Sequence, residues 1–460
     1  MTSHPRHRPR LLLAVVAVEA AVAALVLVPG ASGTAANAAP ARGPAPGAPG
    51  QASDWNEGDK DGFGTAYGTA SKVWYTLNDG ELTDVYYPRI DTPSLRDSQF
   101  VVTDGTTFTD REDRDSTHQV TLLSPDSLTY RIVNTAKSGD WRITKTFVTD
   151  PLRSTVLERV RFESLTEQKL QLYLLHDVAL SMTGNDDKGV DGPDDSLLST
   201  DGTNASAVVV SRGFAKTSSG YVGTASDGWR DLRSDHQLNA SYEAPKPGNV
   251  VQTGRIRSNG TEGGHQTFTV AIGFAPSGTE GGPAEQAARA LSTAQASMGP
   301  GFDAVQAAYD AGWNRYLSSI DDPPASAADW TTEWNVSAMV LAGSEDKTYR
   351  GGFVAAPGRP WAWANELQDL AVYHAVWSRD LYQIATGLLA VGDDAAANRA
   401  LNYLWTVQQR DDGSFPQNSR LDGTPVFGGL QMDEVAFPIV LAQQLGRTCL
   451  LYTSPSPRDS

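Results

Sequence analysis

Apolar and polar residues alternate along much of the chain between residues 71 and 275. In segment 156–163, Val156, Val160 and Phe162 fall on one side of an extended backbone, and charged residues fall on the other. A period of two is typical of a strand with one buried face. Many such strands, separated by turns and without intervening helices, predict an antiparallel β-sandwich. The same alternation recurs in segments 128–132, 170–174 and 268–274.

Beyond segment 276–283, the apolar residues recur at spacings of three and four. Side chains at this spacing lie along one side of a helix. The expected fold is therefore a β-sandwich at 54–276, a helical linker at 277–325, and the first helices of an all-α domain at 326–448. The apolar stripes are Phe302, Val305, Tyr309, Trp313 and Tyr316; Trp330, Trp334, Ala338 and Leu341; Leu381, Ile384 and Leu388; and Ala397, Ala400, Leu401 and Leu404.

The N-terminal segment has the pattern of an export signal. Three arginines precede an apolar run over residues 11–28, and small residues follow it. This pattern predicts a secretory signal peptide over residues 1–38 and a secreted protein with no stable membrane association after cleavage. A membrane anchor is the alternative, but Glu19 interrupts the run and no basic cluster follows it. Residues 39–53, rich in Ala, Pro and Gly, predict a flexible leader.

The last residues differ from the rest of the chain. Segment 449–460 breaks both the composition and the helical periodicity that run up to Thr448, and it resembles a translated sequencing-adapter tail. We therefore expect this tail to be artefactual and the natural sequence to continue past Thr448; the alternative is a short polar terminus. Cys449 is the only cysteine in the sequence, so no intramolecular disulfide can form.

The charge of the chain limits its partners. The formal net charge is −17 at pH 7, so the chain as a whole repels phosphate groups, and nucleic acid is a poor candidate partner. A neutral ligand such as a sugar is compatible with this charge. We expect a monomer without a cofactor.

One acidic, turn-rich segment, 184–195, raises the question of a metal. Its clustered carboxylates would be able to hold Ca²⁺, although their spacing differs from that of an EF-hand loop. A solvated loop is the favoured interpretation, because Asp and Gly are common in turns.

The densest group of candidate functional residues lies between residues 345 and 437. Aromatic rings can stack on the apolar face of a pyranose, while carboxylates, amides and guanidinium groups can hydrogen-bond its hydroxyls. The group therefore indicates a sugar-binding site, although tryptophans also occur in cores and an Arg-Asp pair can start a helix. It includes Trp361, Trp363, Tyr373, Trp377, Arg379, Asp380, Tyr382, Gln408, Gln409, segment 411–418, Gln431, Asp433 and Glu434.

At these residues the chain resembles bacterial members of glycoside hydrolase family fifteen, the glucoamylases and glucodextranases. The resemblance extends over residues 54–448, and its motifs occur in one order. The N-terminal part is similar to the β-sandwich domain that precedes the catalytic barrel of the family. The motifs are Phe63-Gly64-Thr65-Ala66, Asp84-Val85-Tyr86-Tyr87-Pro88, Glu345-Asp346-Lys347-Thr348-Tyr349, Gly352-Phe353-Val354-Ala355, Val376-Trp377-Ser378-Arg379-Asp380-Leu381-Tyr382, Asp412-Gly413-Ser414-Phe415-Pro416-Gln417-Asn418 and Leu430-Gln431-Met432-Asp433-Glu434.

The resemblance implies an (α/α)₆ barrel and an inverting, exo-acting hydrolysis that releases glucose from the non-reducing ends of α-glucans. Arg379 and Asp380 would hydrogen-bond the hydroxyls of the terminal glucose, and Trp377 would shape the wall of the pocket. For Asp433 and Glu434 two interpretations remain open, a role in the pocket and the start of a helix over residues 435–445.

The chain departs from the family at the catalytic residues. The general acid of the family lies in a Trp-Glu-Glu-like stretch and its general base lies later, and we expect both beyond Thr448. No residue of this chain is therefore assigned to catalysis, and we expect the chain to be an inactive fragment. The linkage stays open between α-1,4, α-1,6 and trehalose. The competing hypothesis is a secreted carbohydrate-binding module without hydrolytic activity.

Overall fold

The computed structural model describes residues 42–56, 58–258, 265–276, 282–358 and 373–447. The predicted signal peptide at 1–38 and the predicted tail at 449–460 lie outside the described residues. Within the described ranges, no helix is both long enough and apolar enough to cross a membrane.

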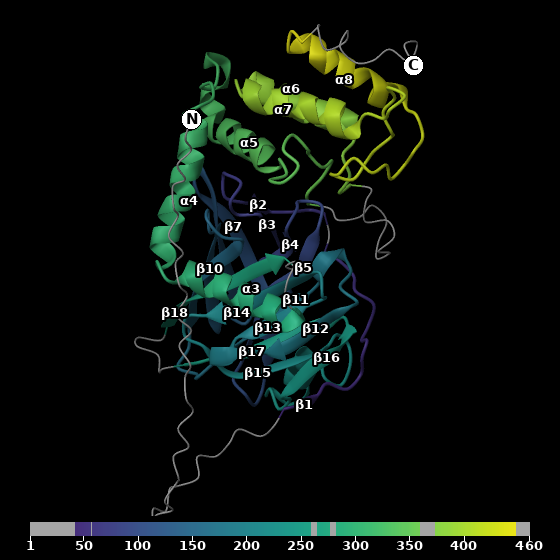
Figure 1. Cartoon of the computed structure of the whole chain (residues 1–460). Helices are drawn as coiled ribbons and strands as arrows, with labels where there is room; N and C mark the ends of the chain where they lie inside the picture. The colour runs from purple at the N-terminus through teal and green to yellow at the C-terminus, as the bar shows by residue number, and fades with distance from the viewer. Residues whose placement is uncertain (1–41, 57, 259–264, 277–281, 359–372, 448–460) are drawn as a thin grey trace, which may run out of the picture. The chain divides into compact units, whose positions relative to one another are not determined.

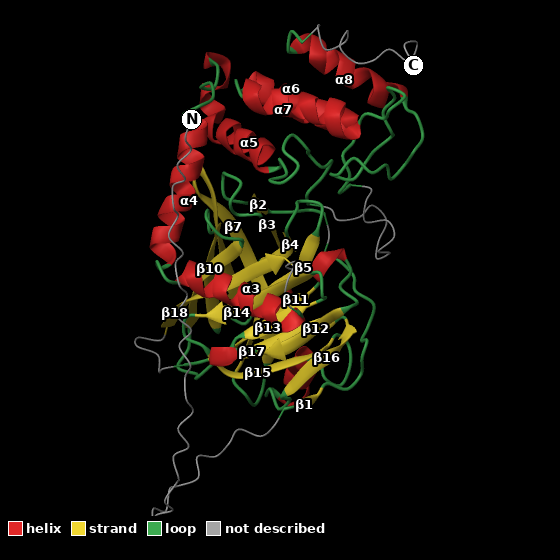
Figure 2. Cartoon of the chain, viewed as in Figure 1, coloured by secondary structure: helices red, strands yellow, loops and turns green. Residues whose placement is uncertain are grey.

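The first layer of the fold is a ten-stranded sheet, and all its pairings except β1 with β16 are antiparallel. Figure 2 shows the strands in yellow. In order across the sheet, its strands are β1 (Gly43–Pro44), β16 (Tyr242–Gly248), β12 (Asp187–Asp191), β13 (Leu197–Thr200), β14 (Asn204–Val210), β18 (His265–Pro276), β10 (Thr155–Ser164), β9 (Trp141–Thr149), β8 (Ser127–Ala136) and β7 (Ser116–Ser124).

The second layer is an eight-stranded antiparallel sheet. In order, its strands are β15 (Phe214–Tyr221), β17 (Val250–Ile256), β11 (Gln171–Val178), β5 (Pro93–Thr103), β4 (Glu81–Tyr86), β3 (Trp74–Asn78) and β2 (Gly62–Gly64), with β6 (Thr109–Arg111) paired to β5.

Apolar side chains from both sheets form one core. Val160 and Phe268 of the first sheet and Phe100 and Leu174 of the second belong to the same buried cluster. The β-sandwich predicted from the alternation is therefore confirmed, and the predicted strands correspond to β8, β10, β11 and β18.

Helix α3 covers the first sheet, as Figure 1 shows, and begins at Pro283, where the sequence period changes. Gly273 of β18 makes this close packing possible. A Cβ atom at that position would lie 2.6 Å from the backbone nitrogen of Ala294, so only glycine fits here. Ala290 and Ala294 of α3 are fully buried, which is consistent with a helix that approaches a sheet through small side chains.

The helices beyond α3 follow the predicted stripes with one exception. The α4 stripe is buried throughout, but Trp330 is 62% exposed and lies in a short 3₁₀ turn before α5. The prediction for Trp330 is therefore wrong, because the helix that carries the stripe begins one residue later. The α-helices are α1 (Glu112–Asp115), α2 (Gly228–Asp235), α3 (Pro283–Met298), α4 (Phe302–Leu317), α5 (Thr331–Gly343), α6 (Ser378–Ala390), α7 (Asp394–Tyr403) and α8 (Met432–Gln444); the 3₁₀ turns are Leu180–Met182, Pro193–Asp195 and Ala325–Trp330, and a π turn covers Leu404–Gln408.

Two further expectations need correction, and the first concerns the leader. Residues 42–53 are not a flexible leader, because their backbone is hydrogen-bonded to the sandwich. The amide of Ala45 donates to the carbonyl oxygen of Glu243 at 2.6 Å. The amide of Asn249 donates to the carbonyl oxygen of Pro49 at 2.8 Å. The segment is rich in Pro and Gly because it makes turns, and the fold therefore begins by Gly43 rather than near Asp54.

The second correction concerns the acidic segment 184–195. Part of it forms β12, in which Asp187 is fully buried, so it is not simply a solvated loop. Asp191 pairs with Arg42, a partner that is distant in the sequence. In the described part of the chain, no group of three or more His, Cys, Asp and Glu side chains is arranged to hold a metal ion.

The sandwich core also contains three ionisable side chains that are almost completely buried, Glu112, Lys145 and Glu158. Lys145 Nζ donates to Glu112 Oε2 at 2.8 Å, and Glu112 also accepts from the amide of Phe100 at 2.7 Å. Neither carboxylate oxygen of Glu158 has a hydrogen-bond partner among the described residues. Burial raises the pKa of Glu158 to about 8, an effect that Lys145 reduces and Glu112 increases.

The Glu158→Gln substitution is expected to flatten the pH dependence of stability. The folded pKa of Glu158, about 8, lies above its usual value of 4.5, so the folded chain retains a proton that the unfolded chain releases. The resulting stabilisation is fully present below pH 4.5 and is lost as the pH rises through 8. Glutamine stays neutral and has nearly the same shape as glutamic acid. The urea midpoint of the variant should therefore fall less than that of the wild type between pH 4.5 and pH 8.

The control is Glu163→Gln on the same strand, where the side chain is partly exposed and paired with Arg161. Parallel pH profiles for the wild type and Glu158→Gln would contradict a neutral Glu158.

Candidate functional site

The start of helix α6 is fixed by a short backbone bridge. The amide of Val376 donates to the carbonyl oxygen of Ser419 at 2.8 Å, and the amide of Ser419 donates back at 3.0 Å. The buried side chain of Gln408 reinforces this bridge, because its Nε2 donates to the carbonyl oxygen of Val376 at 2.7 Å. Trp377 is the N-cap residue of α6. The side chains that follow Trp377 therefore project from a well-defined backbone position.

Arg379 is at the centre of a cluster of charges. Its Nη1 donates to Asp433 Oδ2 at 2.8 Å and lies 3.3 Å from Glu434 Oε1. Its Nε lies 3.6 Å from Asp380 Oδ2. Asp380 belongs to the first turn of α6, whereas Asp433 and Glu434 belong to the first turn of α8. Three carboxylates from two helices therefore surround one guanidinium group.

Glu434 connects the two helices. Its side chain is fully buried, and Oε2 accepts hydrogen bonds from Ser378 Oγ at 2.7 Å and from the amide of Arg379 at 2.8 Å. A carboxylate that accepts from the first amides of a helix also interacts favourably with the helix dipole. This geometry gives Glu434 a positioning role: it fixes Arg379 and the start of α6.

Two aromatic rings lie beside the charges. The guanidinium carbon of Arg379 is 5.3 Å from the ring centroid of Trp377. The rings of Trp377 and Phe427 are 6.4 Å apart, with an interplanar angle of 56°. Phe427 is 40% exposed, and the carboxamide of Asn418 fixes its backbone by accepting from its amide at 2.9 Å. The cluster therefore combines a cation, carboxylates and exposed aromatic surface.

The electrostatics divide the three carboxylates into two kinds. The hydrogen bond from Arg379 lowers the pKa of Asp433 below its usual value. Burial raises the pKa of Asp380 and of Glu434, and the neighbouring Arg379 partly offsets both shifts. The pKa of Arg379 itself is raised, first by its hydrogen bond to Asp433. Asp433 is thus the fixed anion that holds the guanidinium.

The cluster retains hydrogen-bonding capacity. Asp380 Oδ2 and Glu434 Oε1 are buried and accept no hydrogen bond from the described residues. A guanidinium group beside such acceptors and an aromatic ring can satisfy adjacent hydroxyls of a neutral polyol, whose hydroxyls both donate and accept. The arrangement is thus suited to binding a sugar.

The structure brings together all five residues predicted to bind substrate: Trp377, Arg379, Asp380, Asp433 and Glu434. Their role in sugar binding stays a prediction. The helix-start interpretation of the pair at 433–434 is confirmed, because both residues lie in the first turn of α8, whereas their role in a pocket stays a prediction. Trp361 and Trp363 lie outside the described residues, and Tyr373 is 39% exposed.

The motif at 345–349 has a different role from that of the cluster. Lys347 is buried, and its Nζ donates to Thr65 Oγ1 at 2.6 Å and to the carbonyl oxygen of Ala66 at 2.9 Å. Asp346 accepts from the amide of Ile90 at 3.1 Å. This motif therefore joins the segment after α5 to loops and strands of the sandwich, through the Phe63-Gly64-Thr65-Ala66 motif itself.

Sequence reasoning missed the supporting roles of Ser378 and Phe427, and it named Gln408 only as one of many polar residues. Ser378 and Gln408 are buried polar residues whose partners, Glu434 and Val376, lie 56 and 32 residues away in the sequence. Ser378 lies inside the motif at 376–382, and its hydroxyl between Trp377 and Arg379 is the signal that would have identified it. Phe427 carried no such signal.

Comparison with known proteins gives consistent results. Residues 45–318 match the family described as glucodextranase, domain N. A glucoamylase from Clostridium sp. (strain G0005) is 32% identical over 404 residues, which covers 87% of this chain and 55% of the relative. The crystal structure of a bacterial glucoamylase complexed with acarbose matches with a TM-score of 0.81 and 31% identity, over 89% of this chain and 59% of that one. The chain thus spans little more than half the length of each.

Proposed function

Because this chain belongs to the glucodextranase domain N family and to the glucoamylase-like proteins of glycoside hydrolase family fifteen, we propose that it forms the glucan-binding part of an exo-acting hydrolase. The activity of the whole protein is the release of glucose from non-reducing ends of α-glucans. The chain itself binds the terminal glucose without cleaving its bond.

The Arg379 cluster is the observation that carries this proposal. Its guanidinium group is oriented by Asp433 and Glu434, and Asp380 offers an acceptor without a hydrogen-bond partner among the described residues. Bidentate contacts from such groups to adjacent hydroxyls select a sugar, and Trp377 supplies an apolar surface for its ring. Asp380 is in this proposal a binding residue and not the general acid.

The reaction of the whole protein follows the inverting scheme. One carboxylic acid protonates the leaving oxygen while a carboxylate on the opposite face activates a water, with about 6.5–9.5 Å between the two groups. We place this pair in the part of the relatives that the chain does not span, within an (α/α)₆ barrel to which α5–α8 belong. The linkage preference among α-1,4, α-1,6 and trehalose depends on that part.

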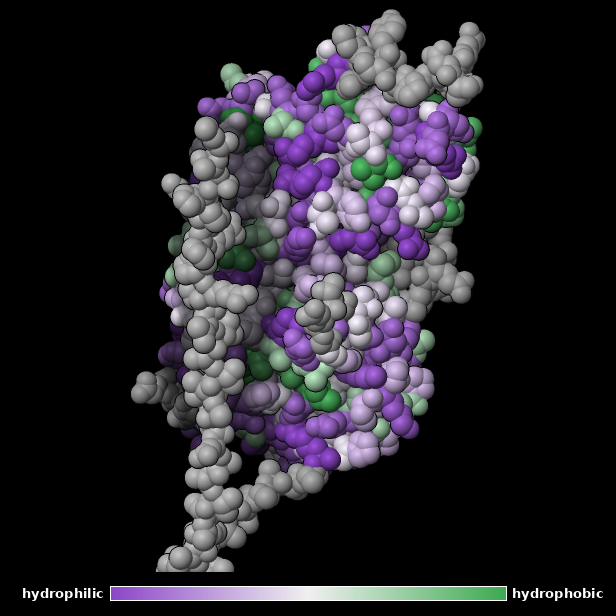
Figure 3. Space-filling view, in the orientation of Figure 1, coloured by the Kyte–Doolittle hydropathy of each residue, from purple (hydrophilic) through white to green (hydrophobic). Residues whose placement is uncertain are grey.

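The remaining properties are proposed from charge and surface. The net charge of −17 argues against nucleic acid as a partner. The face drawn in Figure 3 is mainly hydrophilic with small apolar areas. A monomer stays part of the proposal. The N-terminal pattern supports secretion.

The Arg379→Ala substitution is expected to weaken binding of maltoheptaose and acarbose to the chain about 10- to 100-fold, because a hydrogen bond to a charged group contributes about 1.5–3 kcal/mol. Isothermal titration calorimetry of both ligands measures the effect. Isomaltooligosaccharides in the same assay distinguish the α-1,4 from the α-1,6 preference.

Arg289→Ala is the matched control, since Arg289 is a partly exposed arginine of α3 whose one ion pair with the described residues is to Glu285. Equal affinities of the Arg379 and Arg289 variants would contradict the proposed site. Binding that survives Arg379→Ala, together with a whole protein that lacks hydrolytic activity, would instead favour a carbohydrate-binding module.

A further inference from the structure

A second site lies in the sandwich, separate from the helices that carry Arg379. A cavity of about 640 Å³ opens beside helix α2, over strands β5, β11 and β17 of the eight-stranded sheet. Its volume falls within the range of about 300–1,000 Å³ that is usual for small-molecule sites. We propose that this cavity is a second carbohydrate site that takes a neutral oligosaccharide; that the sugar is an α-glucan rests on the proposed function.

Strand register creates the floor of the cavity. Asp97 of β5 lies directly opposite Asp177 of β11. Because alternate residues of a strand point to the same face, both carboxylates leave the sheet on the side opposite the apolar core. Asp97 is 3% exposed and Asp177 is 9% exposed. Adjacent buried carboxylates of like charge are unfavourable unless other groups compensate them.

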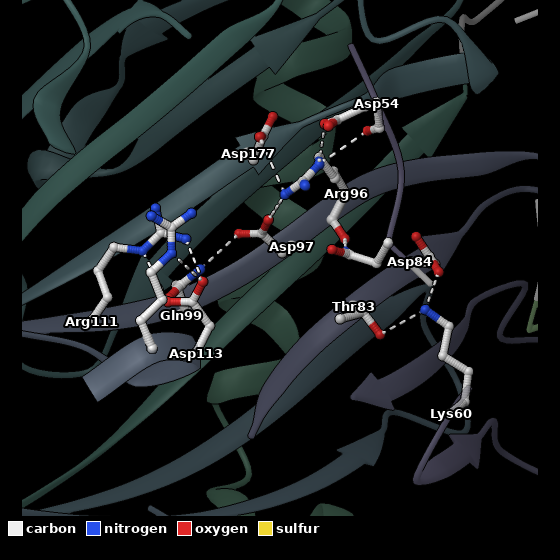
Figure 4. Close-up of polar contacts among 12 residues, drawn as sticks. Asp54, Lys60, Thr83, Asp84, Arg96, Asp97, Gln99, Arg111, Asp113 and Asp177 are labelled. Atoms are coloured by element: carbon white, nitrogen blue, oxygen red, sulfur yellow. Dashed lines mark hydrogen bonds and ion pairs between the residues drawn. The ribbon is translucent and has the colours of Figure 1, made fainter. Parts of the chain in front are cut away.

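Arg96 supplies that compensation only in part. Figure 4 shows its guanidinium group between Asp54, Asp97 and Asp177. It pairs closely with Asp97 and contacts Asp54 at 2.9 Å, but Asp177 Oδ2 is 3.9 Å away. Asp177 Oδ1 has no hydrogen-bond partner among the described residues. A buried acceptor of this kind on the floor of a cavity is available to a ligand hydroxyl.

The rim has the opposite charge. Arg114, Arg230 and Arg233 are exposed there, and Arg230 and Arg233 form no ion pair with any carboxylate in the described part of the chain. Arg111 is held by two hydrogen bonds to Asp113, at 2.7 and 3.0 Å. The rim therefore presents donors above a floor of acceptors.

Trp229 of α2 adds an aromatic ring to this rim. The guanidinium carbon of Arg111 is 5.0 Å from the centroid of the indole, so the ring is held in place by a cation–π contact. The helix itself is anchored by Asp227, whose carboxylate accepts from the amide of Trp229 at 2.9 Å and from that of Gly223 at 2.8 Å. An indole fixed in this way is a suitable platform for the apolar face of a pyranose.

The balance of charge decides the class of ligand. Five arginines and four aspartates line the cavity. An anion would meet the buried carboxylates of the floor, and a cation would meet the arginines of the rim. Sugar hydroxyls donate to the carboxylates and accept from the guanidinium groups without adding net charge. Burial also raises the pKa of Asp177, which reduces the negative charge of the floor and so its attraction for a cation.

The test uses the chain labelled with 5-fluorotryptophan and titrated with maltoheptaose. The sequence has eleven tryptophans, so Trp229→Phe and Trp377→Phe identify the two resonances of interest. We expect the fluorine resonance of Trp229 to shift with maltoheptaose and to do so equally in the Arg379→Ala variant. The double variant Arg230→Ala/Arg233→Ala removes two exposed side chains that form no ion pair in the described part of the chain, and with them one hydrogen bond, from Arg230 Nη1 to the carbonyl oxygen of Gly223 at 2.6 Å. We expect it to raise the maltoheptaose concentration that gives half of this shift about tenfold.

Each result separates the two sites. A shift of the Trp377 resonance without one at Trp229 would overturn the second site and leave the proposed function intact. If neither resonance moves, both proposals are wrong. A Trp229 shift that inorganic phosphate produces more readily than maltoheptaose would overturn the assignment to a neutral sugar. The Arg289→Ala variant, on the other face of the sandwich, should behave as the wild type.

Discussion

The Lys145→Met substitution is expected to lower the free energy of unfolding by about 3–5 kcal/mol at pH 7, because it leaves a buried carboxylate without its partner. Glu112 is fully buried and paired with Lys145 at 2.8 Å. Methionine keeps an apolar stem of similar length and removes the ammonium group, whose nitrogen lies 5.9 Å from the ring centroids of Phe100 and of Phe147. The loss therefore reports the charge rather than the packing. Urea unfolding followed by tryptophan fluorescence measures it.

A double-mutant cycle separates this charge effect from others. The combination of Glu112→Gln with Lys145→Met should recover most of the lost stability, because glutamine can still accept from the amide of Phe100 without a charge. A loss below about 1 kcal/mol for Lys145→Met at pH 7 would mean that the buried pair contributes no more than a surface pair does.

The sequence predicted the fold well where one face of each element is buried. In β10, Val160 is buried and Arg161 is exposed, which is the alternation that the sequence displays. The change of period at α3 was equally clear, because the buried side chains of α4 recur every three or four residues. Both patterns are local, so they do not depend on knowing the tertiary partners.

The leader and the acidic segment were mispredicted because their structure depends on distant partners. Residues 42–53 have the composition of a linker, yet their backbone groups bond to residues about 200 positions away, including Glu243 and Asn249. Composition cannot show that partner. Likewise Asp187 is buried in β12 only because neighbouring strands cover it.

The candidate site was predicted in its residues but not in its construction. The motif around Trp377 identified Arg379 and Asp380 as candidates. The contact that orients Arg379 comes from Asp433 of α8, more than fifty residues later in the sequence. For the motif at 345–349, the sequence identified the residues but not their role. Lys347 donates to Thr65 and so connects the motif to the sandwich. The sandwich cavity was not predicted, since its lining comes from separate strands, a helix and loops.

The 460-residue chain is expected to bind maltooligosaccharides but to release no measurable glucose from them. Inversion requires two carboxyl groups on opposite faces of the sugar, and each contributes about 10²–10⁴-fold through general acid–base catalysis. In the Arg379 cluster, Asp380 and Asp433 contact the same guanidinium group, at 3.6 and 2.8 Å. They therefore lie on the same side of any sugar that this group binds. Glu434 is fully buried and engaged with Ser378, so it cannot supply the opposite face.

The measurement compares the chain with a form extended to the length of its relatives, using glucose release from maltooligosaccharides and isomaltooligosaccharides, with the Clostridium glucoamylase as assay control. We expect turnover from the extended form alone, with inversion visible as β-glucose in the first minutes by proton NMR. Asp380→Asn in the extended form should mainly raise KM, because Asp380 binds the sugar and does not transfer its proton. Turnover by the 460-residue chain that Asp380→Asn abolishes would instead place the general acid at Asp380, and it would overturn the division of binding and catalysis argued from the shared guanidinium.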